Sequence, residues 1–200
     1  MSMDAPSSIK LPTKKLFTTE QAQRYGVSQQ TLSRLTKRGE LLRVAHGLFL
    51  HPDSTWPSDM EIDWAIARTI FGPNSYIGGL TALFLYNLID TPQQAVWVTV
   101  PLKTRTTRPR FRLIRTALSQ KHGIETAKHY RIATPTRAVF DALYFTEIWG
   151  QSLAFAAART AITERLINLD ELERLAKKLG HPRLIEKYYN LLTFEALGLK

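Results

Sequence analysis

The chain has 200 residues, 44% of them apolar, which is enough for packed cores and excludes wholesale disorder. It contains no cysteine, so disulfides, thiolate zinc sites and cysteine nucleophiles are excluded, and a reducing cytoplasm is compatible. The formal net charge of +10 is concentrated in residues 1–51 (+5) and 101–145 (+8), which indicates one or two surfaces that meet a polyanion, although a generally basic, solvated surface stays open as the alternative.

The chain begins with a polar segment that contains two prolines, which predicts a flexible N-terminal tail over residues 1–15 and does not resemble a signal peptide. A first helix is expected over Thr19–Tyr25. Thr18 is its N-cap and Gln21 closes a capping box, while Gly26 supplies the C-terminal stop.

A second helix follows the same rules, with Ser28 as its N-cap and Gly39 at its end. Leu32 and Leu35 share one face by their spacing and are expected to point inward. The outward face then consists of Gln29, Gln30, Ser33, Arg34 and Lys37. Two short apolar segments, Leu41–Val44 and Gly47–Leu50, predict a hairpin.

Helix, turn, helix and hairpin in this order predict a winged helix-turn-helix over residues 16–51. Such a domain reads base edges from the second helix and contacts phosphates with flanking basic groups. A solvated amphipathic helix is the plainer interpretation of the same pattern. The candidate DNA-binding residues are Ser28, Gln29, Gln30, Thr31, Ser33, Arg34, Lys37, Arg38, Arg43 and His46.

A linker is expected over His51–Pro57, followed by a second domain over residues 58–200. The longest apolar run, Tyr76–Ile89, is too short to span a bilayer, so we expect a cytoplasmic protein without a membrane partner. Helices are predicted over about 58–71, 80–87, 135–147, 151–163, 169–179 and 182–196, and strands over 76–77, 95–101, 110–115 and 129–132. The fold class is therefore α+β, with a small sheet and several helices after the winged helix.

The strand predicted over Arg110–Arg115 is expected to place Phe111 and Leu113 inward and Arg110 and Arg112 on one wet, basic face. Its surroundings form a possible second nucleic-acid contact. A solvated sheet edge, on which charges discourage strand pairing, and a protein-binding surface are the alternatives. The residues concerned are Lys103, Arg105, Arg108, Arg110, Arg112 and Arg115.

Three segments together resemble one known family. "FTTEQAQRYGVSQQTLSRLTKRGELLRVAHGLF" (Phe17–Phe49) is similar to the winged-helix head of AbiEi-family antitoxins of type IV toxin–antitoxin systems. "SYIGGLTALFLYNLIDTPQQAVWVTVP" (Ser75–Pro101) and "YRIATPTRAVFDAL" (Tyr130–Leu143) resemble parts of that family's second domain. The ordered resemblance covers about residues 16–180.

The resemblance implies a sequence-specific DNA-binding repressor that binds an inverted repeat in its own promoter and self-associates on DNA. It also implies a nucleotidyltransferase-like toxin as the functional partner, countered through the second domain without stable binding. Two alternatives stay open: a toxin-neutralising protein-interaction module, and an orphan DNA-binding regulator without a toxin.

Neither an enzyme nor a cofactor is expected. The histidines have no metal-ligand spacing, and no glycine-rich phosphate loop is present. Arg137 and Asp141, at i and i+4 of a predicted helix, are expected to form a structural ion pair rather than a catalytic one.

Overall fold

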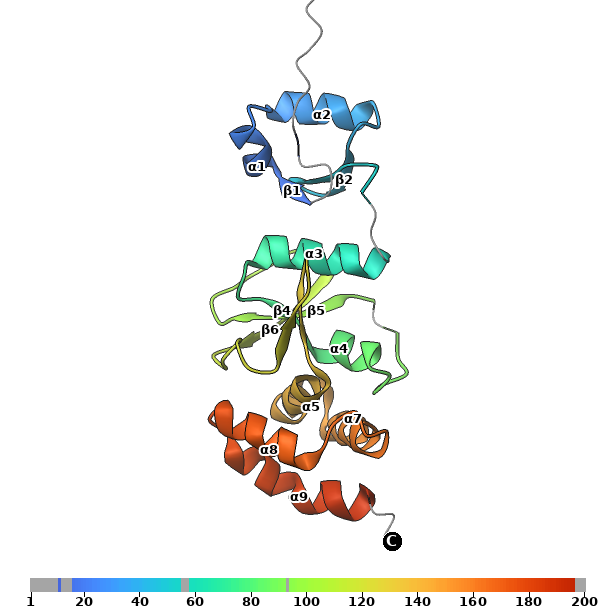
Figure 1. Ribbon diagram of the computed structural model, residues 1–200, viewed down its shortest axis with the longest axis vertical. Coiled ribbons are helices and arrows are strands. Elements are labelled where there is room, and N and C mark those ends of the chain that lie inside the picture. Colours follow the sequence, from blue (N-terminus) through green and yellow to red (C-terminus); the bar gives the residue numbers. More distant parts are fainter. Residues whose placement is uncertain (1–10, 12–15, 55–57, 93, 197–200) are drawn as a thin grey trace, which may run out of the picture. The chain divides into compact units, whose positions relative to one another are not determined.

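The computed structural model describes residues 11, 16–54, 58–92 and 94–196 (Figure 1). The chain divides into two compact units, Met1–Ile66 and Ala67–Lys200. The predicted tail over residues 1–15, apart from Leu11, and residues 55–57 of the predicted linker lie outside the described residues. No helix of the described part is long and apolar enough to cross a bilayer.

The first unit contains a small antiparallel sheet and two helices joined by a short turn (Figure 1). The sheet has the strand order β1-β3-β2, so the predicted hairpin of β2 and β3 gains a third strand from the segment before the first helix. In chain order the elements are β1 (Phe17–Thr18), α1 (Thr19–Arg24), α2 (Gln29–Lys37), β2 (Leu42–Ala45) and β3 (Leu48–Leu50).

Both helices of this unit begin at the predicted caps. The Thr18 hydroxyl accepts from the Gln21 backbone N–H at 3.1 Å, and the Gln21 side chain accepts from the Thr18 N–H at 2.9 Å, which confirms the capping box. The Ser28 hydroxyl accepts from the Thr31 N–H at 3.1 Å and caps α2. The turn between the helices contains Gly26, whose φ of 76° favours glycine.

One apolar core holds the first unit together. Leu32 and Leu35 of α2 are buried in it, which confirms the predicted inward face of this helix. Phe17 and Phe49 stack with ring centroids 6.0 Å apart, because β1 pairs with β3 in a register that places these two residues opposite each other. The remaining members are Ala22, Val27 and Leu41, with Leu11 packed against them.

The second unit is built around a mixed sheet with the strand order β6-β5-β4-β8-β7. Strands β5 and β6 run parallel to each other, and β4 runs antiparallel to β5 and parallel to β8. The strands are β4 (Tyr76–Ile77), β5 (Val96–Pro101), β6 (Phe111–Thr116), β7 (Ile124–Thr126) and β8 (Arg131–Ala133). Strand β7 was not predicted from the sequence.

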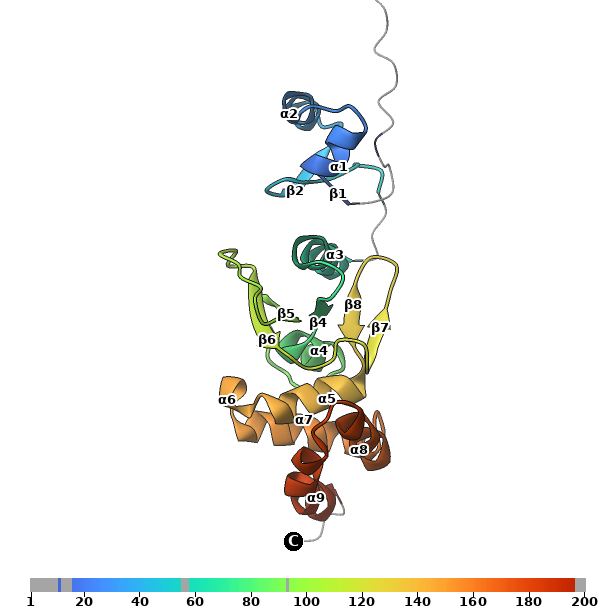
Figure 2. The same cartoon turned by 90° about the vertical axis from the view of Figure 1, so that its left-hand side faces the viewer.

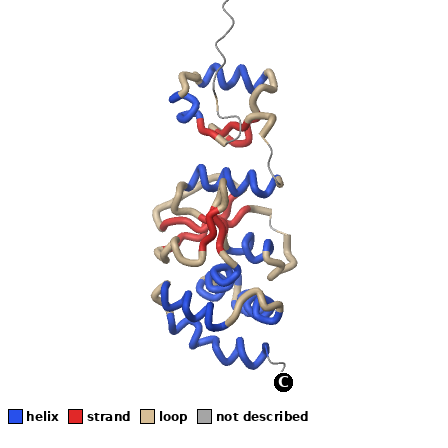
Figure 3. Tube along the Cα trace, in the orientation of Figure 1, coloured by secondary structure: helices blue, strands red, loops and turns tan. Residues whose placement is uncertain are grey.

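Helices cover the sheet and then pack on each other. Figures 1 and 2 show α4 and α5 on one side of the sheet, with α7, α8 and α9 beyond α5. Figure 3 shows the same separation of helix and strand layers. The helices are α3 (Asp59–Phe71), which contains the boundary between the two units, α4 (Gly79–Leu85), α5 (Pro135–Tyr144), α6 (Thr146–Trp149), α7 (Gln151–Thr163), α8 (Leu169–Lys178) and α9 (Pro182–Ala196).

A hydrogen-bonded charge network lies inside the second unit. Arg137 and Asp141 are fully buried, and the Tyr76 hydroxyl donates to Asp141 Oδ2 at 2.9 Å. The Arg137 Nη1 group donates to the carbonyl oxygens of Ser119 and His122 at 2.9 and 2.8 Å. Arg137 Nε donates to Asp141 Oδ1 at 2.7 Å, so the predicted pairing is confirmed.

Candidate nucleic-acid interface

The outer face of α2 is polar, basic and exposed. The α2 side chains predicted to point outward, Gln29, Gln30, Ser33, Arg34 and Lys37, are all exposed, whereas Leu32 and Leu35 are buried. The first turn of α2 contains no acidic residue, so the partial positive charge at this end of the helix is not neutralised by its own side chains. This face therefore attracts anions.

Three hydroxyls have roles within the helix: those of Ser28 and Thr31, which belong to the predicted set, and that of Thr36, which does not. Ser28 and Thr31 hydroxyls lie 3.0 Å apart at the N-cap, in addition to the cap bond from the Thr31 N–H. The Thr36 hydroxyl donates to the Leu32 carbonyl oxygen at 2.9 Å. Ser28 and Thr31 thus define the start of α2. The side chains that project from its exposed face are Gln29, Gln30, Ser33, Arg34 and Lys37.

The hairpin of β2 and β3 carries two further basic side chains of the predicted set, Arg43 and His46. Arg43 Nη2 donates to His46 Nδ1 at 2.9 Å, and both side chains are exposed. Since arginine has no acceptor, His46 accepts through Nδ1 and carries its proton on Nε2. Arg38 lies 3.8 Å from Glu40, with both side chains more than half exposed, and such a surface pair contributes little.

The predicted alternation of β6 holds over its first half and fails over its second. Phe111 is buried and Leu113 half-buried, while Arg110 and Arg112 are exposed, as expected from the sequence. Side chains alternate along a strand, so Ile114 lies on the side of Arg112, and Arg115 on the side of Phe111. Because Ile114 is buried and Arg115 is exposed, the wet, basic face does not continue along the strand.

The reason is that apolar groups cover β6 from both sides. Phe71 of α3 meets the Phe111 ring edge-on, with centroids 5.4 Å apart. On the other face, Ile114 belongs to the core beneath the helices and lies so close to α4 that a Cβ at Gly79 would come within 2.6 Å of its Cδ1 atom. The basic groups are thus confined to the two ends of the strand and the loop before it.

The loop between β5 and β6 brings part of the second basic segment together. Arg115 Nε donates to the Thr104 carbonyl oxygen at 2.7 Å and so turns back toward this loop. A groove of about 700 Å³ results, lined by Ile70, Leu102, Arg105, Thr106, Thr107, Arg108 and Arg115. Arg105, Arg108 and Arg115 therefore line one groove, while Arg112 belongs to another face and neither Arg110 nor Lys103 lines it.

The sequence reasoning did not single out Arg68, Lys121 and Arg131, which line a pocket with Lys103. They come from separate segments, and the only available signal was the charge of residues 101–145. Among the described residues, no group of three or more His, Asp or Glu side chains is placed to hold a metal ion.

Comparison with known proteins connects the first unit to a family. Residues 13–51 match the family described as "Transcriptional regulator, AbiEi antitoxin". The match confirms the resemblance for the N-terminal segment, which contains both helices and the hairpin. The resemblance of residues 75–101 and 130–143 to the family's second domain stays a prediction. No curated protein matches the chain.

The fold also resembles a solved structure. The crystal structure of the RV2827C protein from Mycobacterium tuberculosis superposes with a TM-score of 0.59, over 89% of this chain and 71% of that one. The two sequences are 12% identical over the superposed residues. At this identity the likeness concerns the fold alone.

Proposed function

From the premise that residues 13–51 match the AbiEi antitoxin family of transcriptional regulators, we propose that the chain is a sequence-specific DNA-binding repressor with a winged helix-turn-helix over residues 16–51. The observation that carries this proposal is the exposed face of α2, with glutamines, Arg34 and Lys37 on a helix that is capped and held from below by buried leucines. Such a face is what a recognition helix presents to a groove.

The dimensions of α2 fit that task. An α-helix with its side chains is about 10–12 Å across, and the major groove of B-DNA, about 12 Å wide, admits one. Gln29 and Gln30, in the first turn, suit adenine edges, and Arg34 suits the acceptor pair of guanine. Lys37 and Arg38, a turn further on, suit phosphates, whereas Arg43 and His46 on the hairpin suit the backbone or the minor groove.

The proposed target is an inverted repeat in the chain's own promoter, bound by two self-associated copies in the cytoplasm. In the second unit, the groove of Arg105, Arg108 and Arg115 is proposed to contact nucleic-acid phosphates, because three guanidinium groups line one concave surface. Arg112 is proposed as a separate, weaker contact on another face of the strand.

The same family match supports a role as the antitoxin of a type IV system, in which the partner is a nucleotidyltransferase-like toxin that is not stably bound. Two other roles compete with it: direct neutralisation of a toxin by protein binding, and regulation without any toxin. A toxin gene directly downstream favours the antitoxin role, and copurification of the toxin with this chain favours direct binding.

DNase footprinting of the full chain on its own promoter tests the proposal. We expect protection of two half-sites at nanomolar protein and none on a promoter of scrambled sequence. Equal protection of the native and the scrambled promoter at every protein concentration would indicate nonspecific binding and contradict a sequence-specific repressor. Growth of toxin-expressing cells with and without this chain tests the antitoxin role separately.

A further inference from the structure

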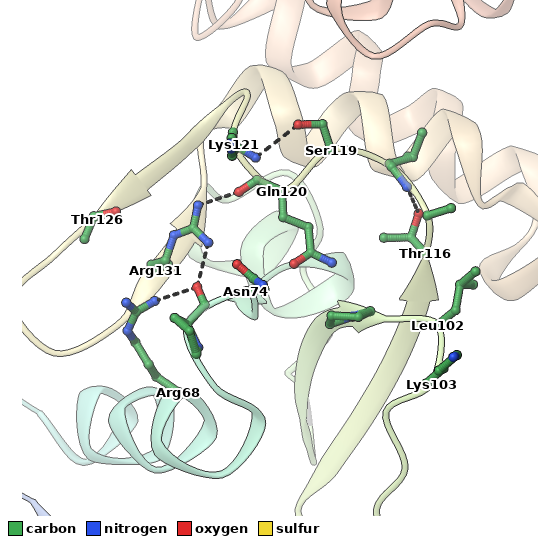
Figure 4. A pocket seen from close by; sticks show the side chains of 14 residues that line it. Arg68, Asn74, Leu102, Lys103, Thr116, Ser119, Gln120, Lys121, Thr126 and Arg131 are labelled. Carbon is green, nitrogen blue, oxygen red and sulfur yellow. Dashed lines mark hydrogen bonds between the residues drawn. The ribbon is translucent and has the colours of Figure 1, made fainter.

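A second pocket, of about 830 Å³, opens within the second unit at the ends of β5 and β6 (Figure 4). Its wall combines the last residues of these two parallel strands, Pro101 and Thr116, with the end of β7 and the start of β8. Four of the 14 described residues that line it are basic, Arg68, Lys103, Lys121 and Arg131, and none of those 14 is acidic.

Two of these cations converge on one neutral acceptor. Arg68 Nη1 and Arg131 Nη1 both donate to the Pro73 carbonyl oxygen, at 3.3 and 2.9 Å, and Arg131 Nη2 donates to the Gln120 carbonyl oxygen. Figure 4 shows the side chains of Arg68 and Arg131 on the same side of the pocket. A carbonyl oxygen accepts hydrogen bonds without supplying a countercharge, so two positive charges remain close together.

No carboxylate balances them. Neither Arg68 nor Arg131 forms an ion pair with any residue in the described part of the chain. Partial burial, and then the nearby charge of Arg68, lower the pKa of Arg131, and the nearby Tyr76 offsets part of this effect. An anion in the pocket would offset the repulsion between the two guanidinium groups.

The remaining groups of the pocket add charge and one unused acceptor. Lys103 and Lys121 are exposed, and in Figure 4 Lys103 lies on the side of the pocket away from Arg68. The side-chain oxygen of Gln120 is buried and has no hydrogen-bond partner among the described residues.

We propose that this pocket binds a small molecule that carries two adjacent phosphate groups, held by Arg68, Arg131, Lys103 and Lys121. Four cations suit a diphosphate better than a single phosphate, and guanidinium groups bind phosphate oxygens in pairs. The volume falls within the range of about 300–1,000 Å³ that is typical of small-molecule sites. The concave shape favours a small molecule over a nucleic-acid backbone, which needs an extended surface.

The probe for this site is inorganic pyrophosphate, titrated calorimetrically into the full chain in magnesium-free buffer. We expect saturable binding at one site, at least tenfold tighter than that of inorganic phosphate. The double variant Lys103→Ala/Lys121→Ala should bind at least tenfold more weakly, because it removes two charges whose side chains are exposed and not needed for folding. Arg131→Gln should also weaken binding, with a thermal melt to confirm that it folds.

The matched control is Lys177→Ala/Lys178→Ala, which removes two exposed lysines from the end of α8. It should bind pyrophosphate like the unmodified chain. Absence of saturable binding, or equal weakening in both double variants, overturns the proposal. Affinity for a DNA duplex of unrelated sequence distinguishes the source of the phosphates. If Lys103→Ala/Lys121→Ala, but not the control, lost as much affinity for this duplex as it lost for pyrophosphate, the pocket would bind the DNA backbone. That result would overturn the proposal of a small-molecule ligand.

Discussion

Arg137 and Asp141 lie one turn apart on α5, and Arg137 Nε donates to Asp141 Oδ1 at 2.7 Å with both side chains fully buried. Burial alone lowers the pKa of Arg137, but the neighbouring Asp141 and Tyr76 outweigh it and raise this pKa above its ordinary value. The guanidinium therefore stays charged and holds together strand, loop and helix segments that are distant in sequence. Its removal would leave a buried carboxylate without its ionic partner.

Arg137→Met is expected to lower the free energy of unfolding by about 3–5 kcal/mol, because one partner of a buried pair is removed. The double variant Arg137→Met/Asp141→Leu should recover part of this loss, since no unpaired charge remains. Urea denaturation measures both. Arg174→Met, at an exposed position of α8, is the control and should stay within about 0.5 kcal/mol of the unmodified chain. A loss below about 1 kcal/mol for Arg137→Met would contradict the structural role.

Two phenols should make the fold sensitive to alkali. Burial, followed by the charge of Asp141, raises the pKa of Tyr76 well above its ordinary value. Burial, followed by Glu125 and Tyr130, raises the pKa of Tyr86 to about 12. The folded chain then binds protons that the unfolded chain has released, so the free energy of unfolding falls as the pH rises from about 10 toward 12.

Absorbance of tyrosinate during an alkaline titration, together with urea denaturation at each pH, checks this expectation. Tyrosinate absorbance should keep rising toward pH 12, because Tyr76 and Tyr86 release their protons late, and Tyr86→Phe should remove part of this late change. A titration without the late change while the fold persists would argue against it.

If α2 is the recognition helix, as proposed, two of its cations should give different outcomes on removal. Arg34→Ala should weaken binding to the preferred site by about 1–3 kcal/mol and relax the base preference there. Lys37→Ala should weaken all sequences alike and reduce the salt slope by about 0.9, as expected for one lost phosphate contact. Both side chains are exposed, so unfolding should be unaffected.

Gel-shift titrations over a range of salt concentrations measure these effects, and Arg24→Ala, in the last turn of α1, is the charge-matched control. If the Arg34→Ala and Lys37→Ala variants each bound the native operator with unmodified affinity, α2 would not be the recognition helix.

Two copies of the chain should occupy one operator. A single winged helix covers few base pairs, so specific binding is expected on an inverted repeat whose half-sites lie about 34 Å apart, or a multiple of this distance. Footprinting gives the spacing, and sedimentation of the complex gives the stoichiometry. One protomer on one protected half-site at saturation would rule out the symmetric arrangement.

Opposite faces of β6 should respond differently to loss of charge. Arg105→Ala removes a cation from the groove that also contains Arg108 and Arg115, and should reduce the salt slope of operator binding by up to about 0.9. Arg112→Ala removes the same charge from the other side and should change the slope less. Base preference should be preserved in both, because phosphate contacts position the protein. Equal slopes in all three proteins would leave this groove as a solvated surface.

The elements predicted most closely are those whose signals are local. The bounds of α7 and α9 agree with the prediction. Helix α2 begins after Ser28, as predicted, because a capping side chain bonds to a backbone N–H only three residues away. The outward and inward faces of α2 also followed from its spacing alone, since buried leucines must recur with the helical period. For this reason the candidate DNA-binding face was accessible without a structure.

Other features depended on partners distant in the sequence. Strand β1 has two residues and exists because Phe17 and Thr18 pair with β3, and no local pattern indicates so short a strand. The long helix expected over 135–147 stops at Tyr144, and the chain restarts in α6, which allows the Trp149 indole N–H to donate to the Ala142 carbonyl oxygen at 2.9 Å.

The sequence by itself determined the two-helix unit, the capping that starts its helices and the residues on their exposed faces, because these features rest on contacts between residues three or four positions apart. Tertiary structure alone decided that both faces of β6 are covered, since this depends on Phe71 and α4 reaching opposite sides of the strand. It also decided that Arg68 and Arg131 share the carbonyl oxygen of Pro73. Charge can be counted along a chain, but its concentration in one pocket depends on which strand ends and loops the fold brings together.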